Sequence, residues 1–386
     1  MSFDRPAFAG EITGFVATES RIFPRSPLAP VQKGTGVSLA LQPEYYHDWA
    51  NGTQSVLFVP FLRYDQHDGK RTHFDIRELY WQWVGSTWEL RVGLRRVFWG
   101  VTESVHLVDI INQTDLVEDI DGEHKLGQPM VSFSWIRNWG VINFFVLPGF
   151  RTQTFPGVDG RLRFPVTVDN SQVQYESDAG EKHIDWAVRY SHTLGNFDLG
   201  IAHFSGTDRE PRLLPGRDEN NNEVLTPVYN LIDQTSLDLQ YTIGGWLWKL
   251  EAISRKTRKQ RMTAFAAGFE YTFANIRNSA IDLGVIAEYL FDDRDPNNFY
   301  PTAFEDDIFL GTRLGFNDVQ STELLFGAII DRKNRSSFLN LEASRRVGSA
   351  FKATLEIRGF VNLDNSDFLY AFRRDTYIRV ELRRYF

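Results

Sequence analysis

The sequence predicts an all-β protein, a transmembrane antiparallel up-and-down β-barrel of about 18 strands, with 16 possible. Three observations predict this fold class. Apolar and polar residues alternate with a period of two along nearly all of the 386 residues. Short turns and long loops alternate between the predicted strands. Charges of both signs stand at the positions that would face inward, where they need water.

The period of two is clearest in 184–190 and 265–273, where every second residue is aliphatic or aromatic. Successive side chains of a β-strand point to opposite faces, so each segment would present one apolar face. Eighteen segments have this pattern: 9–21, 35–48, 54–65, 72–84, 87–100, 130–138, 140–150, 183–193, 196–205, 235–243, 246–256, 261–274, 279–292, 307–317, 322–331, 336–347, 351–362 and 374–386.

The connections after even-numbered segments are tight, as at 85–86 and 244–245, whereas those after odd-numbered segments are mostly longer. The longest are 101–129, 151–182 and 206–234. This alternation is typical of a barrel with short periplasmic turns on one rim and long extracellular loops on the other. An even strand number places both chain ends on the short-turn rim. The count stays between 16 and 18, because the sixth and seventh segments are short and the last of these loops leaves room for another hairpin.

Two soluble all-β folds also alternate apolar and polar residues. A β-propeller would show a repeat of about 40–50 residues, and the chain has no such period. A β-sandwich concentrates its aromatic residues on the inner face. Here they gather near strand ends, as at Trp246 and Trp248 beside a turn, or Tyr289 and Phe291 beside a loop. Because aromatic girdles around an aliphatic band are typical of strands that cross a membrane, the pattern favours the membrane barrel.

The composition excludes several classes of protein. The 42 basic residues against 50 acidic ones give a net charge of −8, which is too balanced for a nucleic-acid binder. No run approaches the ~18 apolar residues of a transmembrane helix. The absence of cysteine removes disulfides, thiolate catalysis and cysteine-bound metals. We predict no cofactor and no metal, since neither a glycine-rich phosphate loop nor a set of metal ligands at a known spacing is present.

Enzymatic activity is not predicted either. Ser104, His106 and Asp109 are neighbours in the sequence. A catalytic relay needs directional contacts among hydroxyl, imidazole and carboxylate groups, and this local spacing does not provide them.

The last segment, 376–386, alternates apolar and charged residues and ends on Phe386. It resembles the C-terminal signature of Gram-negative outer-membrane β-barrels, with Arg384 where those proteins usually have an aromatic residue. The stretch 95–109 is similar to porin-like outer-membrane proteins in which an Arg…Trp-Gly strand end precedes an acidic loop.

This resemblance implies a location in the outer membrane of a Gram-negative bacterium, with outer-membrane lipids as partners. It also implies insertion by the barrel-assembly machinery, with Phe386 as the assembly signal, and transport as the default activity. No charged and apolar leader follows Met1, so we expect the export signal to be absent from this chain.

The loop 101–129 is the candidate for narrowing the lumen. It has seven acidic residues against Lys125 alone, which is −6 of the net −8. A barrel of about 16–18 strands would otherwise enclose a wide aqueous hole. We expect the loop to fold inward as an acidic constriction opposite arginines of the preceding strand, so that the field across the lumen orients polar solutes. A loop that lies on the extracellular rim is the alternative. The predicted constriction residues are Glu103, Asp109, Asp115, Glu118, Asp119, Arg91 and Arg95.

Two further groups of charged residues have predicted roles. Residues at inward strand positions would line the lumen, and they are Glu251, Arg255, Glu270, Glu288, Arg313, Glu342, Arg346, Glu356 and Arg358. Basic residues at the long-loop rim would contact the phosphates of lipopolysaccharide, with a solvated loop as the alternative. These residues are Lys256, Arg258, Lys259, Arg332 and Lys333.

The sequence thus predicts a porin-like channel through which small polar or anionic solutes diffuse. Residues 1–386 would form a single barrel domain, monomeric or trimeric, that takes a small-molecule solute and no nucleic acid. Two alternatives stay open. One is an exporter of an anionic polysaccharide, which would need an arginine-rich lumen and a periplasmic partner. The other is a plugged structural barrel whose loops 151–182 and 206–234 bind another surface.

Overall fold

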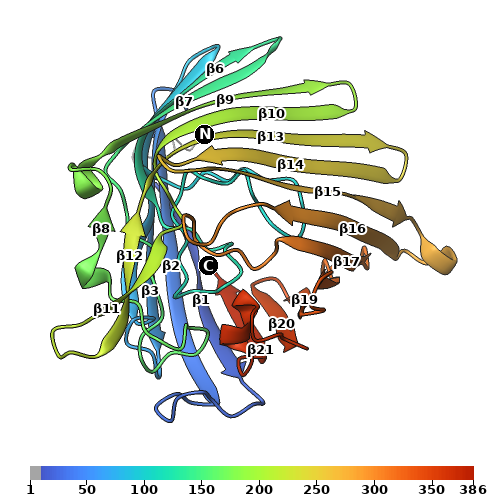
Figure 1. Ribbon diagram of the computed structural model, residues 1–386. Helices are drawn as coiled ribbons and strands as arrows, with labels where there is room; N and C mark the ends of the chain where they lie inside the picture. Colours follow the sequence, from blue (N-terminus) through green and yellow to red (C-terminus); the bar gives the residue numbers. More distant parts are fainter. Residues whose placement is uncertain (1–9) are drawn as a thin grey trace.

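The computed structural model describes residues 10–386, in which 18 strands form one closed sheet (Figure 1). Each barrel strand pairs antiparallel with the next one along the chain, and β21 pairs with β1 to close the sheet. The predicted fold class and the predicted strand number are confirmed. The start of the first predicted segment lies outside the described residues, as do the residues after Met1 on which the expectation about an export signal depends.

The barrel strands lie close to the predicted segments. They are β1 Glu11–Ile22, β2 Thr35–Trp49, β3 Gln54–Asp65, β4 His73–Val84, β5 Trp88–Arg95, β6 Gln128–Arg137, β7 Gly140–Pro148, β9 Ile184–Leu194, β10 Phe197–Thr207, β13 Leu231–Ile243, β14 Trp246–Lys256, β15 Arg261–Phe273, β16 Asp282–Asp292, β17 Asp306–Gly315, β18 Glu323–Asp331, β19 Ser337–Val347, β20 Phe351–Val361 and β21 Tyr377–Tyr385.

The fifth strand departs from the prediction. The predicted segment ran to residue 100, whereas β5 ends at Arg95 and the chain then turns away from the sheet. The backbone N–H of Val97 donates to Asn112 Oδ1 at 2.8 Å, so a side chain of the following loop replaces a strand as its acceptor. The alternation in the sequence therefore continues past the point where strand pairing ends.

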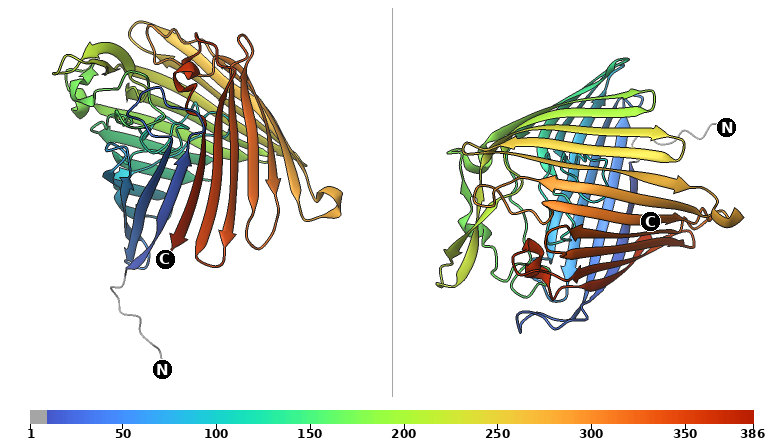
Figure 2. Two further views of the ribbon diagram at one scale, coloured as in Figure 1. Left: turned by 90° about the horizontal axis from the view of Figure 1, so that it is seen from below. Right: turned by 45° about the vertical axis from the view of Figure 1, so that its right-hand side comes forward.

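Long connections gather at one rim of the barrel and short turns at the other (Figure 2). The register pairs Phe15 of β1 with Tyr385 of β21, so the start of the first strand and the C-terminus share the short-turn rim, as predicted. The extra hairpin that the sequence left open in 206–234 exists but adds no barrel strand. Its strands β11 (Arg212–Arg217) and β12 (Glu223–Tyr229) join β8 (Gln174–Tyr175) in a separate sheet at the long-loop rim (Figure 1).

Helical structure in the described chain is confined to short 3₁₀ turns. These are η1 Asn170–Gln172, η2 Gly180–Lys182, η3 Ile276–Asn278 and η4 Phe368–Phe372. Among residues 10–386, no helix has the length and apolar character needed to cross a membrane.

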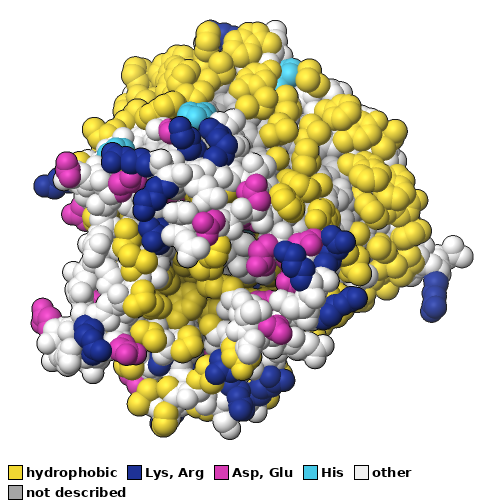
Figure 3. All heavy atoms as spheres, in the orientation of Figure 1, with side chains coloured by type: hydrophobic (Ala, Val, Ile, Leu, Met, Phe, Trp, Pro, Cys, Tyr) yellow, Lys and Arg dark blue, Asp and Glu magenta, His cyan; other side chains and the backbone are white. Residues whose placement is uncertain are grey.

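The outer wall of the barrel is apolar. Outward-facing side chains such as Ile201, Leu310 and Trp248 are 45–51% exposed. Figure 3 shows the resulting hydrophobic surface along the wall at the right of the view. An apolar outer band is what lipid contact requires, since hydrocarbon cannot solvate charges.

The largest buried apolar cluster lies on the inner side of the wall. Val108, Ile110 and Ile111, which follow β5, are 0–2% exposed and belong to the same cluster as Ile253 and Met262 of the wall. A connecting segment therefore supplies part of a core inside the barrel, and the lumen is not simply a water-filled tube.

The barrel closes where the last residue meets the first strand. The N–H groups of Phe386 and Gly14 each donate to the carbonyl of the other at 3.1 Å. Gly14 has a φ of +148°, and a Cβ there would lie 2.4 Å from the carbonyl oxygen of Gln42 on β2. Glycine is thus needed at this seam. The role of Phe386 as an assembly signal stays a prediction.

We predict that Gly14→Ala lowers the free energy of unfolding by about 1–3 kcal/mol, because the added Cβ forces the seam to shift. Urea unfolding of barrels refolded into lipid vesicles measures this change. Gly69→Ala is the matched control, since a Cβ at Gly69 meets no atom within 4 Å. Equal stability of the wild type and Gly14→Ala would contradict the argument.

Candidate functional site

The segment 96–127, which joins β5 to β6, spans the lumen, and we call it the crossing loop. Asn112 ties its two ends together, because its side-chain nitrogen donates to the carbonyls of Arg95 and Leu126 at 2.7 and 2.8 Å. The first arm, 97–108, reaches β14 and β16. The second arm, 113–121, reaches strands β1, β3, β4, β20 and β21 on the other side. The loop therefore bridges two sides of the barrel.

Carboxylates of the wall hold the first arm through its backbone. Glu251 of β14 and Glu288 of β16 are 0% and 2% exposed. Backbone N–H groups donate to them, so their charge is stabilised without a neighbouring cation of the wall. The donors to Glu251 are Val101, Thr102 and Val108, and the donors to Glu288 are Glu103 and Ser104, all at 2.7–3.1 Å.

His106 of the first arm lies between two carboxylates. Its Nε2 is 3.0 Å from Glu123 Oε1, and its Nδ1 is 3.8 Å from Glu251 Oε1. Burial by itself would lower the pKa of His106, but the nearby carboxylates of Glu123 and Glu251 raise it to about 10. The imidazole is therefore charged at neutral pH and links the loop to the wall.

Arginines of the wall hold the second arm through its acidic side chains. The carboxylates of this arm are largely buried, and each has a guanidinium partner at ion-pair distance. The pairs are Asp115 with Arg77 (2.6 Å), Glu118 with Arg63 (2.7 Å), Asp119 with Arg21 (2.9 Å) and Arg379 (2.8 Å), and Asp121 with Arg358 (3.0 Å).

The predicted acidic constriction is therefore electrically neutralised. Burial alone would raise the pKa of Glu118, but Arg63 and Arg71 lower it to about 2, so the group stays ionised as the partner of arginine. Of the other predicted residues, Glu103 pairs with Arg313 at 2.6 Å. Each acid of the second arm thus has a basic partner in the wall and does not contribute to a free acidic field. Asp109 pairs within the loop, 3.2 Å from Lys125.

Arg91 and Arg95 do not oppose the acids of the loop, contrary to the sequence interpretation. Arg91 pairs with Glu89 of its own strand at 2.6 Å, and Arg95 donates to Ser132 of β6 at 2.6 Å. Both residues stand on the strand that feeds the loop, whereas the acids of the second arm dock on other strands. The arginines that sequence reasoning missed are Arg21, Arg63, Arg71, Arg77 and Arg379. Four of these arginines stand at inward positions of β1, β3, β4 and β21, so the alternation in the sequence could have found them.

The predicted lumen-lining charges fall into two groups. Those under the crossing loop and the neighbouring loops are buried, which corrects the expectation that they all need water. Loop donors and ion pairs replace that water. The buried members are Glu251, Arg255, Glu288, Glu356 and Arg358, at 0–4% exposed. The other predicted residues are less buried. Arg313 pairs with Glu103 and with Glu270, which is itself a predicted residue. Glu342 pairs with Arg358, and Arg346 is exposed.

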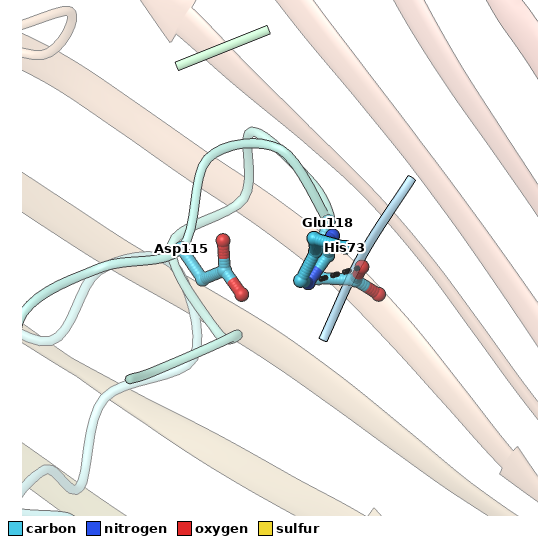
Figure 4. Close-up of side chains that lie close together, drawn as sticks. All are labelled: His73, Asp115 and Glu118. Carbon is cyan, nitrogen blue, oxygen red and sulfur yellow. Dashed lines mark ion pairs between the residues drawn. The ribbon is translucent and has the colours of Figure 1, made fainter. Parts of the chain in front are cut away.

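One trio of side chains has the spacing of metal ligands. Figure 4 shows His73 and Glu118 together, with His73 Nε2 3.6 Å from Glu118 Oε1, and Asp115 beside them on the crossing loop. Arg77 and Arg63 already neutralise the two carboxylates. The trio therefore fits the anchoring of the loop better than a cation site.

Two other groups have comparable spacing. Asp119, Asp121 and Glu356 are likewise paired with arginines. The third group, at the long-loop rim, consists of Glu305, Asp307 and Asp331. Among the described residues no Lys or Arg lies within 4.0 Å of these carboxylates, and backbone N–H groups donate to Asp307 and Asp331.

The Ser104, His106 and Asp109 side chains do not form a catalytic relay. Ser104 Oγ donates to Glu288, and Asp109 is paired with Lys125. His106 faces Glu123 and Glu251 and contacts neither of the other two side chains.

A cavity of about 640 Å³ lies beside the crossing loop. Its wall includes inward residues of β17, β18, β19 and β20 and residues of the loops 151–182 and 293–305. Figure 3 shows a hollow lined by hydrophobic side chains between the loops, with charged side chains around it. Its size is that of pockets that hold small organic molecules.

Three basic residues form a row toward the short-turn rim. The register places Lys352 of β20 directly opposite Arg346 of β19 on one side and Arg383 of β21 on the other. Arg383 pairs with Glu381 at 2.7 Å. Among the described residues, Arg346 and Lys352 have no carboxylate within 4.0 Å. Like charges directly opposite each other repel, so this part of the lumen favours anions.

The basic residues predicted to contact lipopolysaccharide are exposed at the long-loop rim. Arg258 pairs with Glu176, and Arg332 pairs with Asp306 and lies over the outward ring of Tyr289. Lys256, Lys259 and Lys333 are exposed as well. Their contact with lipopolysaccharide stays a prediction.

No family model and no curated protein matches the chain. Several solved structures are similar to it. One is a BenF-like porin from Pseudomonas fluorescens Pf-5, at 10% identity and a TM-score of 0.56, covering 98% of this chain and 97% of that one. Another is a loop L8 deletion mutant of OmpT, an outer membrane protein of Vibrio cholerae, at 10% identity and a TM-score of 0.50, covering 99% and 100%. The chain thus has the fold of porin-type outer-membrane barrels.

We predict that Glu118→Gln lowers the free energy of unfolding by about 3 kcal/mol, because Arg63 loses its closest carboxylate while it stays buried. Urea unfolding in vesicles measures the change. Glu219→Gln, at the exposed tip between β11 and β12, is the control and should stay within about 0.5 kcal/mol of the wild type. Equal effects of the two substitutions would show that the crossing loop is not held by this pair.

The raised pKa of His106 predicts that the stability of the barrel depends on pH. Its folded-state pKa of about 10 lies above the ordinary 6.5, so its contribution is complete below pH 6.5 and is lost as the pH rises toward 10. We expect the wild type to exceed His106→Gln by ~2 kcal/mol in unfolding free energy at pH 6 and to converge with it near pH 10. A difference that stays constant over this range would exclude the charged histidine as the link.

Proposed function

We propose that the chain is an outer-membrane channel of the porin type, through which small polar or anionic solutes diffuse across a narrowed lumen. The observation that carries the proposal is the crossing loop, which connects two sides of the barrel through buried ion pairs and backbone hydrogen bonds. A fixed loop of this kind reduces the cross-section of a barrel that would otherwise be wide. The porin-type fold supports a location in the outer membrane.

The charges that stay unpaired support a preference for anions. The acids of the crossing loop are matched by arginines and lysine, whereas Arg346 and Lys352 face each other without a described carboxylate nearby. This row therefore gives one stretch of the proposed path a local basic charge. Because the acids of the crossing loop are paired, that stretch supports the anionic class of solute.

A plugged barrel is the second candidate. Its support is the apolar core inside the barrel, where Val108 and Ile111 of the crossing loop are 0% exposed in one cluster with residues of the wall. Such packing resists displacement of the loop. The exporter of an anionic polysaccharide has less support, because the inward face carries carboxylates as well as arginines.

We predict ohmic conductance steps when the protein is reconstituted in a planar bilayer, with a reversal potential in a KCl gradient that indicates a preference for chloride. The double variant Arg346→Glu/Lys352→Glu should shift this potential toward the value for potassium, because it reverses the sign of the row. Arg345→Glu is the matched control, since Arg345 faces outward and pairs with Asp318.

Each outcome of the recording decides between the candidates. An electrically silent barrel would contradict the channel and favour the plug. Open steps whose reversal potential is the same in the double variant and the control would contradict the anion preference.

A further inference from the structure

The cavity beside the crossing loop has an aromatic wall. Phe338 and Phe360 face each other across β19 and β20 with ring centroids 5.4 Å apart, and Phe360 stacks on Phe372 of η4 at 5.7 Å. Phe164 of the loop 151–182 lies 5.8 Å from Phe372. All four rings line the cavity. Inward aromatic rings are costly against a column of water, so this wall is suited to an apolar molecule.

The charges around the cavity are satisfied within the protein. Arg255 and Arg294 both pair with Glu210, and Arg358 pairs with Asp121. Of the basic side chains that line the cavity, Arg163 alone has no described carboxylate within 4.0 Å. Its guanidinium donates to backbone carbonyls of its own loop, at 2.7–3.2 Å. Nearly all of the lining therefore presents no free charge to a ligand.

Six buried polar atoms of residues that line the cavity have no described hydrogen-bond partner. Four belong to the ion-paired groups of His106, Asp109, Arg209 and Arg358. The other two are uncharged amide oxygens. They are Asn340 Oδ1, between Phe338 and Glu342 on β19, and Gln153 Oε1 in the loop 151–182. Both are amide oxygens, which accept hydrogen bonds and cannot donate them. A buried acceptor without a donor is costly, so each atom favours a molecule that brings an O–H or N–H group. A carboxylate cannot serve, because it only accepts.

We infer that this cavity binds an uncharged solute with an apolar body and a hydroxyl or similar donor group. The body would pack on the partly buried rings of Phe338, Phe368 and Phe164, which Phe360 and Phe372 support from behind. The donor would meet Asn340 Oδ1 or Gln153 Oε1. The volume of about 640 Å³ is enough for a bicyclic or larger molecule. The inference goes beyond the proposed function, which concerns solutes that stay hydrated, and it holds whether or not the lumen conducts ions.

Equilibrium dialysis of 2-naphthol against barrels in lipid nanodiscs tests the inference, with empty nanodiscs to subtract partition into lipid. We expect saturable binding near one molecule per barrel. Naphthalene, which lacks the hydroxyl, and 2-naphthoate, which has a carboxylate that Arg163 could hold, should each bind about tenfold more weakly.

Three variants locate the site. Phe338→Asn/Phe368→Asn changes two partly buried rings of the wall and should weaken 2-naphthol binding about tenfold or more. Asn340→Leu should remove the preference for 2-naphthol over naphthalene. Phe273→Asn, an outward ring at the short-turn rim, is the matched control and should bind as the wild type does. Heat-dependent migration on a gel reports whether each variant is a folded barrel.

Several results would overturn the inference. These are no saturable binding above that of empty nanodiscs, tighter binding of 2-naphthoate than of 2-naphthol, or the same loss of binding in Phe273→Asn as in the wall variant. A barrel that is silent in the bilayer and yet binds 2-naphthol would contradict the proposed channel and leave this site intact.

Discussion

A closed sheet of 18 strands encloses more space than the inward side chains of its own strands can fill, and the rest of this structure depends on that constraint. The crossing loop and parts of the loops 151–182 and 293–305 occupy the excess space. Once they do so, their backbone groups and charged side chains leave water and need partners. The wall supplies these partners as carboxylates on β14 and β16 and as arginines on β1, β3, β4 and β21. The loops and the charge pattern of the wall therefore form a single arrangement.

This arrangement explains why charges of both signs face inward. On one side of the barrel, Glu251 and Glu288 bind N–H groups of the first arm, so acids of the wall are needed there. On the other side, the second arm brings acids of its own, and arginines of the wall pair with them. A buried ion pair adds little net stability against an apolar alternative, but it specifies where the loop docks. Docking at both sides fixes the position of the loop in the lumen.

The lumen consequently has two regions that differ in the chemistry of their side chains. Toward the short-turn rim, a basic row at Arg346 and Lys352 suits hydrated anions. Beside the crossing loop, an aromatic wall suits a molecule that leaves water. A channel for ions and a binding cavity for an apolar solute are compatible in one barrel, because different strands and loops build them. The same apolar packing that forms the cavity also opposes movement of the loop, which is why a plugged barrel is the serious competitor to an open channel.

The sequence alone determined the barrel. A period of two, alternating short and long connections, and aromatic residues near strand ends are local properties of a strand in a membrane, so they specify strand positions and both rims. It also indicated that 101–129 is the segment that could enter the lumen. Only the tertiary structure decided which charges meet, because partners such as Asp119 and Arg379 are 260 residues apart and no local spacing relates them. For the same reason, the sequence could not show that the acidic loop is neutralised, or that phenylalanines from two strands, a 3₁₀ turn and a loop form one wall.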